Sequence, residues 1–199
     1  MNISTRAADV KSQFNLPNAL TWLRIFMAPA IIVLFYLPYA WADPAACAGF
    51  ALAGITDTLD GYYARKLHLT SRLGAFLDPV ADKLIVVTAL VLIVSKDARW
   101  FVVIMAVVII GREIAVSALR EWMAEIGARG RIAVSGWGKI KTIVQIVGLS
   151  MMLYRQDLFG LPVYQMGLAL SVIAMVLTLW SMILYLQAAW PELRGSSRL

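Results

Sequence analysis

Six apolar segments dominate the chain, and each is close to the length that a helix needs to cross a bilayer, about 20 residues. They are predicted at about 19–40, 45–66, 72–95, 99–125, 133–154 and 163–187. Hydrophobic residues make up 61% of the chain and charged residues 15%, against about 45–50% and 25% in soluble domains. We therefore expect one all-α integral membrane domain over residues 1–199, with six transmembrane helices.

Lysine and arginine predict the orientation of these helices, because both residues collect in cytoplasmic loops. An inside N-terminus puts nine of them on the inner side and three in the outer connections. The inner set is Arg6, Lys11, Arg65, Lys66, Arg72, Arg129, Arg131, Arg194 and Arg198, and the outer set is Lys96, Arg99 and Arg155. Both termini are thus expected in the cytosol, with the protein in the inner (cytoplasmic) membrane. Residues 1–14 are expected to form a short helix on the membrane surface.

Charge and cysteine content exclude other classes of protein. The net charge is +6, but the basic residues do not form the stripe that nucleic-acid binding needs. We therefore expect no nucleic-acid partner. The single cysteine, Cys47, cannot form an internal disulfide or a cysteine-based zinc site, and we interpret it as a packing residue.

Four aspartates lie at or inside the predicted membrane boundary of the second and third segments. Helical spacing gives each segment one polar face, the first formed by Asp57, Asp60, Gly61, Ala64 and Arg65, and the second by Ser71, Gly74, Asp78 and Asp82. Ionisable groups at such depth are costly and indicate a functional site. The short connection between the segments allows a tight helical hairpin, which would bring the four carboxylates into one pocket.

Carboxylates this close would repel one another unless cations bind between them. Hard oxygen ligands favour Mg²⁺ or Mn²⁺, and two such ions can support a displacement at phosphorus. Gly61, Ala64 and Gly74 would leave room for a pyrophosphate, and Arg65 could hold a phosphate oxygen. The alternative is a set of ion pairs between the aspartates and Arg65, Lys66, Arg72 and Lys83. That alternative leaves the aligned glycines unexplained.

The pattern Asp57-x2-Asp60-Gly61-x2-Ala64-Arg65-x8-Gly74-x3-Asp78-x3-Asp82 resembles the complete signature of the CDP-alcohol phosphotransferase family. The resemblance implies a six-helix bundle with two metal ions. It implies that Asp57, Asp60 and Asp78 are metal ligands, and that Asp82 contacts the second metal and acts as general base. It also implies that Gly61, Arg65 and Ser71 contact the CDP group.

A second polar cluster lies in the fourth segment and at the start of the fifth. Arg112, Glu113, Ser117 and Arg120 form a helical stripe, and Lys139 and Lys141 follow on the same predicted side. Converging Arg and Lys side chains favour a phosphate on the acceptor alcohol. The alternative interpretation of these cations is that they snorkel towards lipid headgroups. We expect this behaviour of Arg129 and Arg131.

Three stretches narrow the resemblance to one branch of the family. They are NLPNALTWLR, GREIAVSALREWMAEIG and AVSGWGKIKT, and they resemble the members that join CDP-diacylglycerol to sn-glycerol 3-phosphate. Relatives that use inositol phosphate, serine or choline share the aspartates. The prediction of the acceptor alcohol therefore depends only on the second polar cluster and the stretches around it. Asn18 and Thr21 could contact the nucleotide or cap the first helix. Beyond about residue 146 we predict only packing or a homodimer contact.

Two other classes of membrane protein also carry aspartates in their helices. An intramembrane prenyltransferase would need a second aspartate-rich motif, whereas the only later aspartates are Asp97 and Asp157, both predicted in outer loops. A divalent-cation transporter would carry ligands on both sides of the membrane midplane. The aspartates instead gather towards one side, which favours the phosphotransferase.

Overall fold

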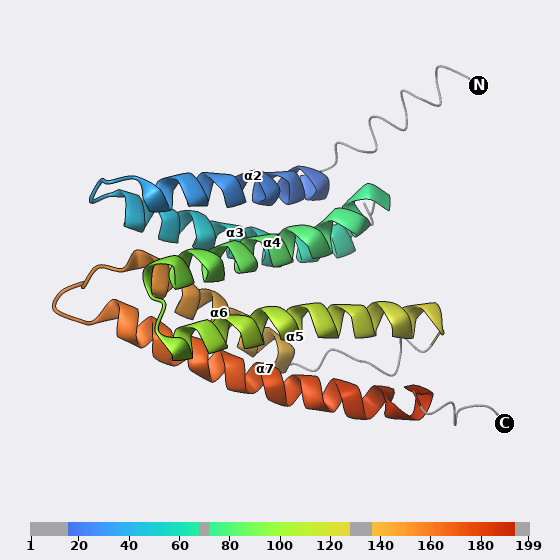
Figure 1. The fold of residues 1–199 in the computed structure, drawn as a ribbon. Helices are drawn as coiled ribbons and strands as arrows, with labels where there is room; N and C mark the ends of the chain where they lie inside the picture. The colour runs from blue at the N-terminus through green and yellow to red at the C-terminus, as the bar shows by residue number, and fades with distance from the viewer. Residues whose placement is uncertain (1–15, 68–71, 128–136, 194–199) are drawn as a thin grey trace, which may run out of the picture. The chain divides into compact units, whose positions relative to one another are not determined.

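The computed structural model describes residues 16–67, 72–127 and 137–193. Six helices follow one another: α2 (Leu16–Tyr36), α3 (Ala42–Leu67), α4 (Arg72–Lys96), α5 (Trp100–Glu125), α6 (Trp137–Tyr154) and α7 (Val163–Leu193) (Figure 1). Each corresponds to one predicted segment, so the all-α prediction is confirmed for the described part of the chain. The surface helix predicted over residues 1–14 lies outside it.

Two of these helices are long and apolar enough to cross a membrane, α5 over Trp100–Glu125 and α7 over Val163–Pro191. Shorter apolar helical stretches cover Thr21–Tyr36 and Ile140–Tyr154. The structure therefore supports membrane-spanning helices, while the full count of six remains a prediction.

The helices divide into two compact units, which we describe separately. The first contains the described residues up to Ile93 together with Leu153–Gln156, and the second contains Val94–Met152 with Asp157–Leu199. In the first unit, α2 packs against α3. A β-carbon added at Gly49 of α3 would lie 3.4 Å from Cγ1 of Ile31, so a small residue at this position allows α2 to approach.

Side-chain contacts give the direction of each helix in the second unit. Arg112 and Arg120 of α5 contact Thr178 and Tyr185 of α7 in the same order along both helices, so α5 and α7 run parallel. On α6, Lys141 contacts Ser181. Further along α6, a β-carbon at Gly148 would meet Ser171, which comes earlier in α7. Hence α6 runs antiparallel to α7, and the last turns of α5 and α7 share one end of this unit with the first turns of α6.

Backbones of α6 and α7 approach closely where they cross. A β-carbon at Gly148 would lie 2.9 Å from the backbone nitrogen of Ser171 and 3.0 Å from the carbonyl oxygen of Gly167. One at Gly167 would lie 2.7 Å from the carbonyl oxygen of Gly148. Small residues commonly allow membrane helices to pack at this distance, where van der Waals contact between backbones replaces side-chain packing.

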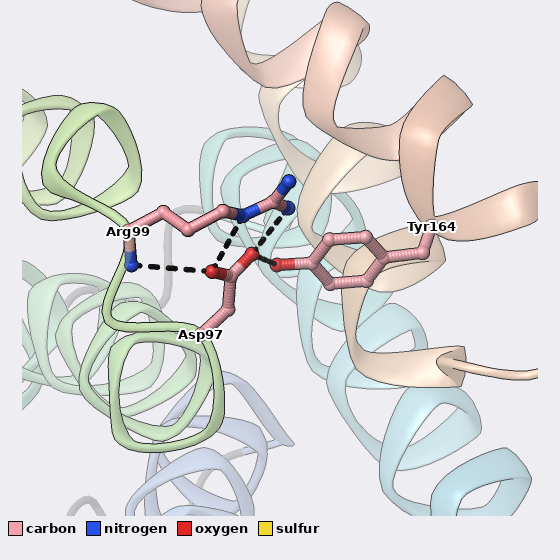
Figure 2. A network of polar contacts seen from close by, with 3 residues as sticks. All are labelled: Asp97, Arg99 and Tyr164. Carbon is pink, nitrogen blue, oxygen red and sulfur yellow. Dashed lines mark hydrogen bonds and ion pairs between the residues drawn. The ribbon is translucent and has the colours of Figure 1, made fainter.

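A polar network ties the start of α5 to the start of α7 (Figure 2). Asp97 lies in the connection between α4 and α5, and its carboxylate accepts hydrogen bonds from Arg99 Nε at 2.8 Å and Arg99 Nη2 at 2.6 Å. The Tyr164 hydroxyl donates to the same carboxylate at 2.5 Å. The Arg99 hydrogen bond is the largest cause that lowers the pKa of Asp97, to about 2. The carboxylate therefore stays ionised over the physiological range.

Candidate functional site

The predicted aspartate faces lie on two helices, as expected. Asp57 and Asp60, with Gly61, Ala64 and Arg65, belong to α3, and Gly74, Asp78 and Asp82 belong to α4. Of these side chains the structure describes only that of Asp82, and Ser71 lies outside the described residues altogether. The convergence of four carboxylates on one pocket is therefore still a prediction.

Asp82 forms an ion pair with Arg24 of α2. The Arg24 side chain is 1% exposed and that of Asp82 is 43% exposed, so the guanidinium is buried while the carboxylate remains accessible. The sequence did not predict Arg24 as a partner of the aspartates. The four cations named there were Arg65, Lys66, Arg72 and Lys83. The available signal was an arginine within an apolar segment, TWLRIF, because a charge at that position needs a partner.

Thr21 lies one turn before Arg24 on the same face of α2, and both are buried. It is the sixth residue of the helix, which begins at Leu16. A capping side chain stands at the residue before the first helical one, so the capping interpretation of Thr21 is wrong. Contact between Thr21 and the nucleotide stays a prediction. The side chain of Asn18 lies outside the described residues.

A cation cluster formed by Arg112, Glu113, Arg120 and Lys141 extends from the middle of α5 to its last turns and the first turns of α6. Arg112 and Lys141 are only 5% and 8% exposed. Glu113 pairs with Arg112, and Lys141 interacts electrostatically with the three other members. Burial of Arg112 argues against snorkelling. The fifth predicted member, Lys139, has its side chain outside the described part of the chain.

Three hydroxyls of α7 contact this cluster, and sequence reasoning missed all three. Arg112 Nη2 donates to Thr178 at 3.4 Å, Lys141 Nζ donates to Ser181 at 3.3 Å, and Arg120 Nη2 donates to Tyr185 at 2.8 Å. The Arg120 guanidinium also lies 5.0 Å from the centre of the Tyr185 ring. We call these three residues the α7 hydroxyl stripe. Their only signal in the sequence is the spacing of polar residues along an apolar helix, Thr178-x2-Ser181-x3-Tyr185.

The cation cluster keeps an excess of positive charge. Three cations and one carboxylate leave a net charge of +2, because the hydroxyls that contact the cations are neutral. Arg112 Nε is buried and has no hydrogen-bond partner among the described residues. Buried donors are usually satisfied, so this arrangement suits an anion with several acceptor oxygens, such as a phosphate.

Two helices capable of crossing a membrane, an aspartate pattern on α3 and α4, and a cation cluster with two buried members are typical of a membrane protein that handles phosphorylated ligands. The chain matches the CDP-alcohol phosphatidyltransferase family over residues 14–184, and it belongs to that family. The resemblance noted in the sequence is thereby confirmed.

Individual relatives cover almost the whole chain. It is 48% identical over 181 residues to the CDP-diacylglycerol–glycerol-3-phosphate 3-phosphatidyltransferase of Salmonella choleraesuis (strain SC-B67), which covers 91% of this chain and 98% of the relative. The protein of the same name from Escherichia coli (strain K12) is 47% identical with the same coverage.

Proposed function

We propose that this protein transfers the phosphatidyl group from CDP-diacylglycerol to sn-glycerol 3-phosphate, giving phosphatidylglycerophosphate and CMP. The observation that carries the choice of acceptor is the cation cluster with a net charge of +2, in which Arg112 and Lys141 are buried. A phosphorylated acceptor matches this charge, whereas a neutral alcohol such as serine or glycerol does not. The names of the relatives at 47–48% identity support the same reaction.

The aspartates of α3 and α4 would hold two divalent ions, Mg²⁺ or Mn²⁺. The donor set fits these metals, because it consists of carboxylate oxygens and because the accessible carboxylate of Asp82 already accepts a cationic partner, Arg24. Bound there, the ions would neutralise charge on the pyrophosphate. Asp57, Asp60 and Asp78 are proposed as ligands, and Asp82 as both ligand and general base.

In the proposed reaction, Asp82 accepts the proton of the primary hydroxyl of glycerol 3-phosphate. That oxygen forms a bond to the lipid-side phosphorus, the bond from this phosphorus to the oxygen of CMP breaks, and CMP leaves as an anion. A well-placed base contributes about 10²–10⁴-fold to such a step. The 43% exposure of the Asp82 side chain is consistent with access by an incoming hydroxyl.

The remaining predicted residues would bind the two substrates. Proposed contacts to CDP-diacylglycerol are Gly61, Ala64, Arg65, Ser71, Gly74, Asn18 and Thr21. Proposed contacts to the phosphate of glycerol 3-phosphate are Arg112, Glu113, Arg120, Lys139 and Lys141, in which Glu113 orients Arg112. The enzyme would lie in the cytoplasmic membrane with its site and both termini facing the cytosol, and it could form a homodimer.

An acceptor screen with purified protein tests this function. CMP release from CDP-diacylglycerol is measured with glycerol 3-phosphate, inositol phosphate, serine and glycerol, with and without added divalent metal. We expect release with glycerol 3-phosphate alone, and none in excess chelator. Asp57→Ala, Asp60→Ala and Asp78→Ala should each abolish release while the protein still inserts into the membrane. Preferred turnover of inositol phosphate would reassign the acceptor, and full turnover in chelator would disprove the metal mechanism.

A further inference from the structure

The α7 hydroxyl stripe connects three helices at the cation cluster of the second unit. Thr178, Ser181 and Tyr185 are spaced i, i+3 and i+7, which places them on one face of α7 over a rise of about 10 Å. Each hydroxyl contacts one cation, two from α5 and one from α6. Each described cation in the cluster therefore has a hydroxyl partner on α7.

The chemical type of these partners decides what the cluster can bind. Buried cations in a low-dielectric environment are usually paired with carboxylates. Here Glu113 forms an ion pair with Arg112 and interacts electrostatically with Lys141, but the hydrogen-bond partners of the buried Lys141 and the more exposed Arg120 are hydroxyls. A hydroxyl satisfies one donor without cancelling charge, so the net charge of +2 remains available. A phosphomonoester carries close to two negative charges at pH 7, because its second pKa is about 6.

We propose that the α7 hydroxyl stripe is a specificity element of the acceptor site, which holds Arg112, Lys141 and Arg120 in position without neutralising them and so selects acceptors that carry a phosphomonoester dianion. The inference rests on the proposed function, and it assigns to α7 a role in substrate choice. Thr178, Ser181 and Tyr185 are positioning residues, since they act through the cations that contact the phosphate. The buried Arg112 Nε is a further donor available to such a ligand.

A matched pair of variants at Ser181 separates charge from packing. Ser181→Asn and Ser181→Asp introduce side chains of nearly the same size, but only Asp neutralises Lys141. The probes are inorganic phosphate and glycerol 3-phosphate, titrated by calorimetry into purified protein without the lipid donor. We expect Ser181→Asp to bind both probes about tenfold or more weakly than Ser181→Asn. The thermal midpoint of Ser181→Asp should be no lower than that of Ser181→Asn, because a new ion pair replaces a hydrogen bond.

Steady-state kinetics tests the other two hydroxyls. Tyr185→Phe keeps the ring beside Arg120 but removes the hydroxyl, and Thr178→Val keeps the shape of the side chain. Both should raise KM for glycerol 3-phosphate several-fold while KM for CDP-diacylglycerol and kcat change by less than about twofold, as expected when a contact of equal strength in ground and transition states is weakened. Ser171→Ala is the matched control, because Ser171 is a buried hydroxyl of the same helix about 10 Å before Thr178.

The outcomes distinguish this inference from the function on which it rests. Equal phosphate affinity of the two Ser181 variants would overturn the role of the stripe, even if the wild type transfers to glycerol 3-phosphate. An equal rise in KM for Ser171→Ala and Tyr185→Phe would also overturn it, since general packing would then explain both. Conversely, the expected Ser181 difference without transfer to glycerol 3-phosphate would support the stripe and refute the proposed acceptor.

Discussion

Arg24 is the residue at which the structure adds most to the aspartate site. A guanidinium that is 1% exposed cannot be explained as a surface charge, and its partner Asp82 belongs to the family signature. The contact places one positive charge beside the acidic segment and links α2 to α4. Arg24 thus offsets part of the repulsion that four carboxylates would experience.

Replacing Arg24 should therefore destabilise the protein through Asp82. Arg24→Met removes a charge-assisted hydrogen bond that contributes about 1.5–3 kcal/mol, which corresponds to a fall in Tm of roughly 3–12 °C for a chain of this size. In the double variant Arg24→Met with Asp82→Asn, the loss should be smaller than the sum of the two single losses. Thermal unfolding of the four proteins in one detergent measures this coupling.

Strictly additive losses for Arg24 and Asp82 would show that the ion pair contributes nothing measurable to stability.

Sequence spacing predicts which residues share a helix face, but it does not predict which helices meet. The aspartate columns could be read from the sequence because their members lie within one or two turns of each other. The Arg24–Asp82 and Arg112–Thr178 contacts join residues 58 and 66 positions apart, and such pairings depend on helix packing. The hydroxyl residues of α7 could not be identified one by one as site residues from the sequence, because serine and threonine are common in membrane helices.

At the level of helices, the crossing of α6 and α7 depends on two glycines. A β-carbon at Gly148 would meet backbone atoms of Ser171 and Gly167, which cannot rotate away as a side chain can. Gly148→Ala should therefore cost about 1–3 kcal/mol, as overpacking usually does, and lower Tm accordingly.

Gly111 is the matched control for Gly148. It lies inside α5, and a β-carbon there would have nothing within 4 Å. Gly111→Ala should stabilise the helix by up to about 1 kcal/mol, because alanine loses less backbone entropy on folding. Equal Tm changes for the two substitutions would refute the close approach of α6 and α7.

The Asp97 network gives the junction of α5 and α7 a defined pH dependence. Its folded pKa, about 2, lies below the value of about 3.9 expected in the unfolded chain. A depressed carboxyl pKa stabilises the folded state above the unfolded pKa, and the contribution is lost as the pH falls through the folded pKa. We expect the Tm of Asp97→Asn to lie below that of the wild type at pH 6, with the gap narrowing from about pH 4 downwards.

Two variants check the origin of that pH effect. Tyr164→Phe removes one of the hydrogen bonds that lower the pKa of Asp97 but keeps Arg99 beside it, so its Tm gap should be smaller and should narrow over the same pH range. Asp157→Asn alters an exposed aspartate and should follow the wild type throughout. A gap of constant size for Asp97→Asn from pH 6 to 2 would contradict the role of its charge.

For the whole molecule, the order of the six described helices follows from apolar length, since each predicted segment corresponds to one helix, whereas several bounds differ by a few residues. Contacts within the second unit add that α5, α6 and α7 alternate in direction, as consecutive spans must. If all six helices cross the membrane, both chain termini lie on one side.

Labelling of single cysteines in intact cells tests this arrangement. In a Cys47→Ala background, we expect Asp157→Cys in the α6–α7 connection to react with a membrane-impermeant maleimide. Ser197→Cys near the C-terminus should react only after the membrane is permeabilised. The reverse pattern would place the C-terminus outside and invert the proposed orientation.

The parallel register of α5 and α7 also limits how the length of this chain can change. Arg112 and Arg120 meet Thr178 and Tyr185 in step, so the number of residues between the two contacts is set on both helices. Deleting one residue between Arg112 and Arg120 would turn Arg120 by about 100° around the helix axis, away from Tyr185. Insertions and deletions should thus be tolerated in the α6–α7 connection but not within these two short stretches of helix.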